Sequence, residues 1–171
     1  MITGKKIILR GWEADDLPAL QLLRNNFQLQ QQLMSIPRAN SIAQIKEWLT
    51  NKTKPADSIF YVIADSKSNQ CVGYIQVMAI DLLHGLGKLG ICVSPDAQGN
   101  GFGGEAITLL ECYLVDVLKL RKVFLEVLVD NGRAHDLYSR LGYRECGRLK
   151  EHFFLNGKFH DVLIMEKFIG S

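Results

Sequence analysis

The sequence lacks any long uninterrupted apolar run. No stretch approaches the ~18 residues that a membrane-spanning helix needs, and no charged segment followed by an apolar one opens the chain. It also lacks a charge imbalance, because 20 basic and 18 acidic residues leave a net charge of only +2. That balance does not favour binding to nucleic acid or to a membrane surface. These absences predict a cytoplasmic protein with neither kind of partner.

Cysteines are few and scattered. Cys71, Cys92, Cys112 and Cys146 include no Cys-x-x-Cys pair, so their spacing indicates neither a metal site nor a disulfide framework. Each lies in an apolar context, which predicts buried free thiols. The chain also has no repeat, low-complexity tract or linker-like segment. We therefore expect a single domain, 1–171, that buries enough surface to fold without a disulfide or a metal.

The order of the expected elements predicts an α/β (α+β) fold. Runs rich in β-branched and aromatic residues predict strands at 6–10, 59–64, 72–80, 89–93, 123–129, from 143 onward and at 159–168. Apolar residues at helical spacing predict about four helices, starting near Leu17, at 42–49, 106–117 and 134–141. Antiparallel strands come first, followed by a β-α-β crossover and a terminal hairpin. This order predicts a mixed sheet of six to seven strands with helices on its faces.

The most informative segment is the glycine-rich loop 94–104, which connects an expected strand to an expected helix. Glycines let several backbone N–H groups converge on one point, because no Cβ blocks the approach. The helix N-terminus adds unpaired donors and the positive end of the helix dipole. The loop is therefore predicted to bind a phosphate or pyrophosphate, and hence a phosphorylated cofactor.

The same glycines allow two other interpretations. Residues 99–104 match the dinucleotide fingerprint Gly-x-Gly-x-x-Gly, and Asp130 closes the following strand, where a ribose-binding acid would lie. In that fold, however, the first glycine follows the strand almost at once, whereas residues 94–98 intervene here. A flexible loop without a ligand is the third interpretation, although so many glycines cost chain entropy unless something fills the loop.

A pattern in this loop, Gln98-x-x-Gly101-x-Gly103, resembles the Arg/Gln-x-x-Gly-x-Gly/Ala signature of the GNAT family of acetyl-CoA-dependent N-acetyltransferases. The family's Asn-x-x-Ala-x-x-x-Tyr-x-x-x-Gly-Phe/Tyr motif follows the next expected strand, matched by Asn131, Ala134, Tyr138, Gly142 and Tyr143. Segments 8–10 and 14–17 also resemble the family's first strand and helix start. The resemblance thus covers essentially the whole chain. It implies acetyl-CoA as co-substrate and a sheet whose fourth and fifth strands splay apart to admit the pantetheine arm.

The resemblance also implies a role for particular residues. The pyrophosphate would be held by the backbone amides of Gln98, Gly99, Asn100, Gly101, Phe102, Gly103 and Gly104. The pantetheine arm would lie along Ile91, Cys92 and Val93, with Asn131 and Ala134 beside it. A backbone N–H of the splayed strand would polarise the thioester carbonyl, and Gly90 would permit a bulge there.

Two residues are candidates for catalysis. Tyr138 is the candidate acid for the departing thiolate, since a phenol titrates near ~10 and a thiol near ~8.5. Its alternative role is that of a core residue, because it lies on the apolar stripe of its helix. Relatives that read Glu-Leu-Gly supply a basic carboxylate where this chain has Lys88, which needs a strongly lowered pKa to act as a base. Glu126 is the candidate in its place, and an ion-paired strand residue is its alternative; His84 and His152 are weaker candidates.

The acceptor is expected to be a primary amine whose class stays open. Segment 147–159 is similar to the ending of spermidine and ribosomal-protein N-acetyltransferases. Segments 23–26 and 87–91, with the expected helix around Trp48, instead resemble amino-sugar-nucleotide N-acetyltransferases of the pseudaminic acid type. Carboxylates are few in the segments expected to surround the acceptor. The basic residues Arg38, Lys46 and Lys88 favour an anionic acceptor or a peptide amine over a polyamine. A non-catalytic acyl-CoA sensor is the non-enzymatic alternative, and exposed sheet edges are compatible with a homodimer.

Overall fold

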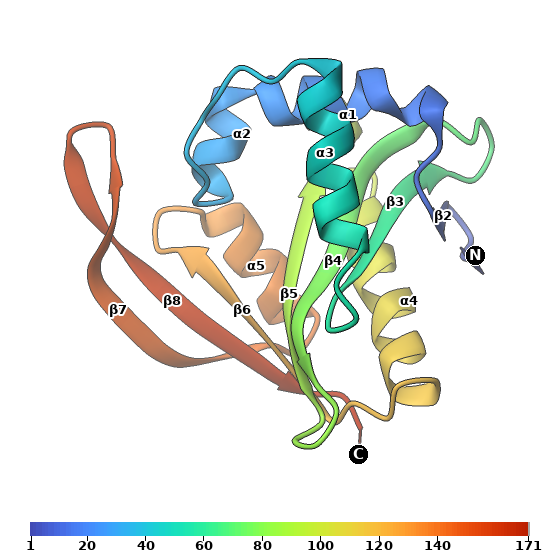
Figure 1. Cartoon of the computed structure of the whole chain (residues 1–171). Helices are drawn as coiled ribbons and strands as arrows, with labels where there is room; N and C mark the ends of the chain where they lie inside the picture. Colours follow the sequence, from blue (N-terminus) through green and yellow to red (C-terminus); the bar gives the residue numbers. More distant parts are fainter. Residues whose placement is uncertain (171) are drawn as a thin grey trace.

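An eight-stranded sheet runs through the molecule in the order β1-β2-β3-β4-β5-β6-β8-β7 (Figure 1). The computed structural model describes residues 1–170. The strands are β1 (Ile2–Thr3), β2 (Ile7–Arg10), β3 (Ile59–Asp65), β4 (Cys71–Asp81), β5 (Leu86–Val93), β6 (Lys122–Leu128), β7 (Arg144–Leu155) and β8 (Lys158–Phe168). The helices are α1 (Leu17–Asn25), α2 (Phe27–Gln32), α3 (Ile42–Thr53), α4 (Phe102–Asp116) and α5 (Gly132–Arg140). The expected mixed sheet with helices on its faces is confirmed.

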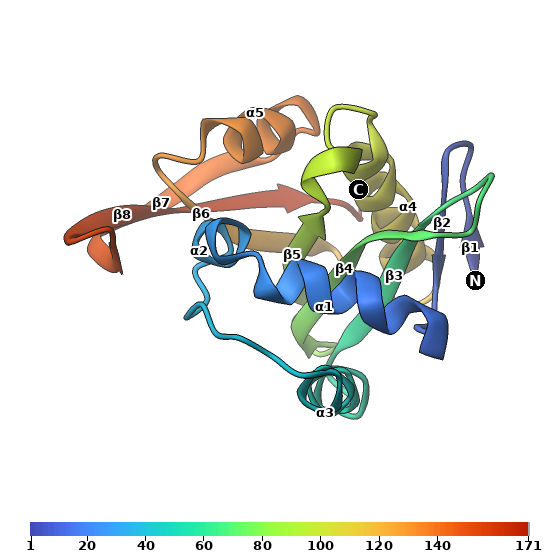
Figure 2. The same ribbon diagram turned by 90° about the horizontal axis from the view of Figure 1, so that it is seen from above.

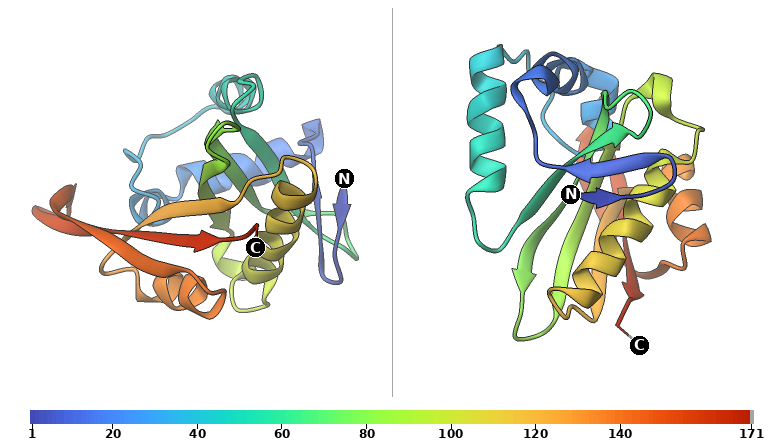
Figure 3. Two further views of the ribbon diagram at one scale, coloured as in Figure 1. Left: turned by 90° about the horizontal axis from the view of Figure 1, so that it is seen from below. Right: turned by 90° about the vertical axis from the view of Figure 1, so that its right-hand side faces the viewer.

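The sheet separates two helical layers. Helices α1, α2 and α3 cover one face, and α4 and α5 cover the other (Figure 2). The two layers are also apparent from below and from the side (Figure 3). Each layer has its own hydrophobic core: Ile107 and Leu110 of α4 are fully buried on one face, and Ile45 and Leu49 of α3 on the other. The sheet is thus buried on both sides along its centre.

Two elements exceed the number expected from the sequence. Strand β1 has only two residues, which is too short to show a periodic pattern. Helix α2 starts directly after α1, where the Asn26 side chain accepts a hydrogen bond from the backbone N–H of Leu29 at 2.9 Å. One polar stretch therefore contains two helices, and the sheet has eight strands rather than six to seven.

Several local signals have the structure that they indicate. Ser41 and Gln44 form the reciprocal capping box at the start of α3. Gly142 has a φ of +90° just after α5, as a helix-terminating glycine should. Asn156 and Gly157 both have positive φ, at 51° and 81°, and connect β7 to β8 in a tight hairpin. This hairpin projects away from the body of the molecule (Figure 1).

The burial expected for the cysteines is only partly correct. All four thiols are free; Cys92 is buried and Cys71 is half-buried, but Cys112 and Cys146 are exposed. Cys112 lies on the outer side of α4 and Cys146 on the edge strand β7, so apolar neighbours in the sequence do not bury them. Among residues 1–170, no helix is both long and apolar enough to cross a membrane.

The centre of the sheet opens between β5 and β6. These strands are parallel and pair through three residues each, ending at Lys88 opposite Phe124. Beyond that pair β5 stays on β4 as far as Val93, while β6 stays on β8 as far as Leu128. The two strands therefore diverge and leave a wedge, as the expected splay requires (Figure 1).

Candidate active site

A cavity of about 1060 Å³ occupies this wedge and extends to both faces of the sheet. Its α4–α5 side is lined by residues of the glycine loop, α4 and α5, and its α1–α3 side by residues of α1, α2, α3 and β4. Most of the residues singled out in the sequence line it: Ile91, Cys92, Val93, Gln98, Gly99, Gly101, Phe102, Gly103, Gly104, Glu126, Asn131, Ala134 and Tyr138. Two segments far apart in the sequence thus meet in one cavity.

Among the cofactor-binding residues predicted from the sequence, Asn100 does not line the cavity. Its carbonyl oxygen accepts a hydrogen bond from Lys6 Nζ at 3.0 Å, and its side-chain amide donates to the Ala97 carbonyl at 3.2 Å. Asn100 therefore fixes the outside of the loop to the segment just before β2. The role of its backbone amide in holding a pyrophosphate stays a prediction.

The glycine loop has the geometry of an anion site. Gly99 and Gly101 have φ values of +87° and +82°, a region that glycine adopts at little cost. Gly101 is also the N-cap of α4, so the free amides of a 15-residue helix face the cavity. The Arg133 guanidinium lies near Gly99, since a Cβ built there would be 3.9 Å from its Nη2. Converging amides beside a guanidinium fit the two negative charges of a pyrophosphate.

Asn131 both caps a helix and lines the cavity. Its Oδ1 accepts a hydrogen bond from the backbone N–H of Ala134 at 3.3 Å and so caps α5. The residue also lines the cavity. Because the cap fixes the side chain, the remaining amide group can be presented to a ligand in a defined orientation.

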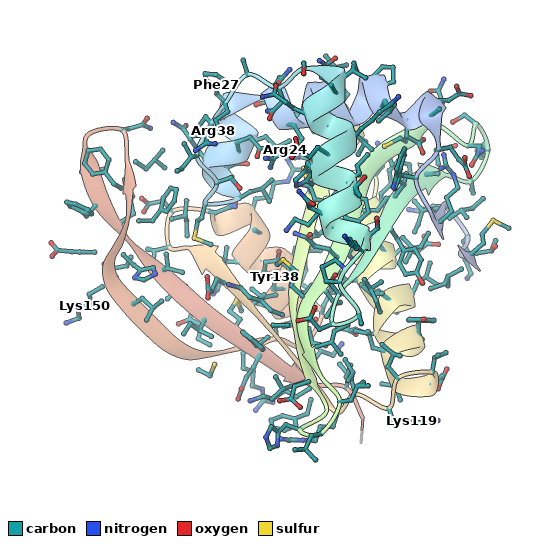
Figure 4. All side chains as sticks on the ribbon, viewed as in Figure 1. Arg24, Phe27, Arg38, Lys119, Tyr138 and Lys150 are labelled. Carbon is teal, nitrogen blue, oxygen red and sulfur yellow. The ribbon has the colours of Figure 1, made fainter. Side chains whose placement is uncertain are left out.

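Tyr138 is both a core residue and a cavity residue. Its side chain is only 7% exposed, yet it lines the cavity from α5 (Figure 4). Its ring lies 5.8 Å from that of Tyr143, whose hydroxyl donates to the buried Glu111 carboxylate at 2.8 Å. Burial raises the pKa of Tyr138 to about 12, so the phenol keeps its proton at neutral pH. The geometry offers a well-positioned neutral hydrogen-bond donor.

Lys88 and Glu126 form an ion pair across the mouth of the wedge. Lys88 Nζ lies 2.8 Å from Glu126 Oε1, and both side chains are about one-third exposed. Lys88 is the last residue of β5 that pairs with β6, and Glu126 lies two residues beyond Phe124, its partner on β6. The lysine that replaces the family's carboxylate is therefore the partner of the carboxylate on the next strand. His84 and His152 do not line the cavity as described for residues 1–170.

The expected bulge at Gly90 is wrong. Gly90 pairs regularly with Gln76 of β4, and the register shift between β4 and β5 lies instead between Met78 and Asp81. A Cβ at position 90 would be only 3.1 Å from Gln76 Nε2. A side chain here would crowd the Gln76 carboxamide, which lines the cavity.

The α1–α3 side contains functional groups to which the sequence analysis assigned no individual role. Arg24 of α1, Lys52 of α3 and Gln76 of β4 all line it. In contrast, Arg38 and Lys46, which favoured an anionic acceptor on sequence grounds, are exposed and do not line the described cavity. Arg24 and Lys52 belong to helices with many polar residues, so no local pattern distinguishes them. Gln76 has a signal, since it is a polar residue in the apolar run 72–80.

A family model described as an acetyltransferase (GNAT) domain matches residues 6–144. The chain belongs to the GNAT family. It is similar to the spermidine N(1)-acetyltransferase of Vibrio cholerae, with 29% identity over 159 residues that cover 93% of this chain and 91% of the relative. The spermidine N(1)-acetyltransferase of Escherichia coli K12 is 26% identical over 165 residues, covering 96% of this chain and 87% of that protein.

A solved structure agrees with this similarity over the whole fold. The crystal structure of spermidine N-acetyltransferase from Vibrio cholerae in complex with CoA and spermine has a TM-score of 0.87, with 28% identity and 95% of each chain covered. This GNAT protein is accordingly an acetyl-CoA-dependent N-acetyltransferase, with acetyl-CoA as its co-substrate. The comparisons give no support to a nicotinamide-dependent oxidoreductase or to a non-catalytic sensor.

Proposed function

We propose that the protein transfers an acetyl group to a primary amine by direct attack within a ternary complex. The observation that carries this proposal is the cavity that passes through the wedge. Its α4–α5 side presents the loop amides, Arg133 and Asn131, which suit a phosphorylated pantetheine ligand. Its α1–α3 side leaves space for a second molecule. The two sides meet between β5 and β6, where Tyr138 and Glu126 both line the cavity.

The reaction needs two proton movements. When bound, acetyl-CoA supplies an electrophilic thioester carbonyl and a sulfur leaving group. An ammonium acceptor releases one proton to become a nucleophile and loses a second as the C–N bond forms, while the sulfur takes up one proton as the C–S bond breaks. The residues at the wedge therefore have to accept a proton on the amine side and donate one on the sulfur side.

Tyr138 is suited to the donor role. It lies on the α4–α5 side, and its raised pKa keeps the phenol protonated across the physiological pH range. A neutral O–H aimed at a developing thiolate stabilises charge by hydrogen bonding as the bond to sulfur breaks. Packing against Tyr143 fixes the ring, so little reorganisation is needed.

Glu126 is suited to the acceptor role. Side chains alternate along β6, and Leu125 and Val127 belong to the core on the α4–α5 side, so Glu126 faces the α1–α3 side. A carboxylate has two oxygens, so the ion pair with Lys88 leaves capacity for a hydrogen bond from the incoming amine. The pair also holds the carboxylate at the point where the two strands separate.

The test is turnover measured beside cofactor binding. Thermal stability with acetyl-CoA, CoA and NAD is compared first, since a ligand at 100 times its Kd adds about 2.7 kcal/mol of stability. CoA release is then measured with spermidine, the acceptor in the names of the relatives, with an amino-sugar nucleotide and with a peptide N-terminus. Stabilisation by acetyl-CoA and CoA, with CoA release for at least one amine, is expected. Binding without release for all three classes, or stabilisation by NAD alone, would contradict the proposal.

A further inference from the structure

Two buried polar atoms have no hydrogen-bond partner among residues 1–170: Arg24 Nε and Gln76 Oε1. Folded proteins rarely leave such groups unpaired, because each costs about 1–3 kcal/mol when desolvated. Both residues line the same α1–α3 side of the cavity. One atom belongs to a cation and the other to a neutral carboxamide, so the polar groups of this part of the cavity wall are incompletely paired within the described residues.

The positive charges on this side are also poorly compensated. Arg24 donates through Nη1 to the neutral Gln30 Oε1 at 2.6 Å, and its guanidinium lies 4.8 Å from the centre of the Trp48 ring. Lys52 Nζ is 3.5 Å from the Met78 sulfur. Neither cation forms an ion pair within residues 1–170. Burial, and to a smaller extent the positive charge of Arg24, lower the pKa of Lys52.

The cavity does not offer the carboxylates that a polycation would need. Among its lining residues within 1–170, Glu126 is the one carboxylate, and it is already paired with Lys88 at 2.8 Å. A polyamine entering the α1–α3 side would therefore face the Arg24, Lys52 and Lys88 cations. Like charges within a partly desolvated cavity repel strongly, because the local dielectric constant is low. The relatives' acceptor is a poor electrostatic match for this chain.

We propose that the natural acceptor is an amine that also carries an oxyanion, with the oxyanion bound by Arg24 and Lys52 and the amine placed beside the Gln76 carboxamide. This inference rests on the proposed function, because it names the substrate class of the same site. A guanidinium matches phosphate and carboxylate oxygens with parallel N–H donors, and a nearby ammonium adds a second charge. Arg24 and Lys52, which both line the cavity, supply these two kinds of group.

The position of Gln76 explains how the amine would be oriented. Gln76 lies opposite Gly90, and the next pair on the same face is Met78 opposite Lys88, where the wedge begins. An amine bound at the Gln76 carboxamide is therefore next to the opening between β5 and β6. The anion at Arg24 and Lys52 would anchor the rest of the acceptor against α1 and α3.

The first experiment compares acceptors that differ by one anionic group. The specificity constant kcat/KM is measured for glucosamine, glucosamine 6-phosphate and spermidine with wild type, Arg24→Met and Lys52→Met. Arg38→Met and Lys46→Met are the matched controls, since they remove the same charges from exposed positions outside the described cavity. Figure 4 shows Arg38 and Arg24. We expect at least a tenfold preference for the phosphorylated amine, lost in Arg24→Met and Lys52→Met and retained within twofold in the controls. Higher kcat/KM for spermidine or glucosamine would overturn the inference and leave the proposed function intact.

The second experiment does not depend on knowing the acceptor. Binding of inorganic phosphate and of acetate to the CoA-saturated protein is measured by calorimetry, so that the pyrophosphate site is already filled. Phosphate or acetate is expected to bind wild type and the Arg38→Met control, and at least tenfold more weakly to Arg24→Met. The stronger of the two anions identifies a phosphorylated or a carboxylated acceptor class. Equal binding to wild type and Arg24→Met, or no binding of either anion to wild type, contradicts the inference even where no tested amine is acetylated.

Two further variants separate anchoring from folding effects. Arg24→Lys keeps the charge and is expected to retain measurable phosphate binding if Arg24→Met loses it for electrostatic reasons. Gln76→Leu removes the carboxamide with little change in volume. It should raise KM for the amine at least fivefold while phosphate binding stays unchanged. A loss of phosphate binding in Gln76→Leu would contradict the separate roles assigned to the two ends of the acceptor.

Discussion

At the scale of single residues, a polar residue within an apolar strand is a signal that can be found in the sequence. Glu126 stands out as the charged residue of an apolar strand, and Gln76 breaks the run 72–80 in the same way. Both line the cavity. Arg24 and Lys52 give no comparable signal, because a charged residue on an amphipathic helix is ordinary. The packing of α1 and α3 against the sheet half-buries Arg24 and Lys52, and that packing depends on residues far away in the sequence.

The donor role of Tyr138 can be tested by removing one hydroxyl. Tyr138→Phe should bind CoA with unchanged affinity and lose about a hundredfold in kcat, the lower range for a general acid. Steady-state kinetics and a CoA titration measure the two effects. Tyr113→Phe, which removes a hydroxyl from α4 outside the described cavity, is the control and should be near wild type. An unchanged kcat in Tyr138→Phe would leave the residue with a packing role alone.

At the scale of elements, the order of strands and helices was largely predictable, and their pairing was not. The capping box of α3 and the hairpin turn at 156–157 depend on neighbouring residues and form as their sequences indicate. The splay between β5 and β6 was expected from family resemblance alone. Its physical cause is that β4 and β8 hold the two strands in diverging directions, which no local pattern records.

The start of α4 provides a test of the anion site. Gly101→Val places a β-branched side chain at a φ of +82°, a left-handed region that costs a non-glycine residue roughly 1–2 kcal/mol. Its Cβ would also lie 3.2 Å from Lys6 Nζ, so relief of the strain should displace the first amides of α4. We expect a loss of stability of about that size in urea unfolding and at least tenfold weaker CoA binding by calorimetry.

Gly132→Ala is the matched control for this loop variant. A Cβ there meets nothing within 4 Å, and the residue begins α5 with ordinary backbone angles. CoA binding should be unchanged, and stability should be equal or slightly higher, since alanine restricts the unfolded chain. If both variants bind CoA as wild type does, the assignment of the loop to the pyrophosphate is wrong.

At the scale of the whole molecule, the sheet divides the interior into two cores, and each contains buried phenol or thiol groups that keep their protons. Tyr138 lies in the core beneath α4 and α5, while Cys92 and Tyr74 lie beneath α1 and α3. Burial raises the pKa of Cys92 from 9.0 to about 12 and that of Tyr138 from 10.0 to about 12. Their protons are therefore held by the folded protein at pH values where the unfolded chain has lost them.

This difference predicts a loss of stability at alkaline pH. Because both folded-state pKa values lie above the unfolded ones, the full contribution is present below pH 9 and is lost progressively between pH 9 and about 12. Each group lowers the free energy of unfolding by roughly 1.4 kcal/mol per pH unit within its window. Urea unfolding from pH 8 to pH 11 measures the trend, and Cys92→Ala should show a shallower decline between pH 9 and 10. A stability that stays constant up to pH 11 would contradict the prediction.

The cavity reaches both faces of the sheet, and this affects how the two products would be released. CoA would leave past α4 and α5, while the acetylated product would leave past α1 and α3, so neither has to wait for the other to clear a shared exit. A single molecule in which the acceptor is joined to the pantetheine sulfur would have to thread the slot between β5 and β6. Such a bisubstrate ligand would contact residues on both faces of the sheet. Its dissociation would be limited by the separation of β5 and β6, which their pairing with β4 and β8 holds in place.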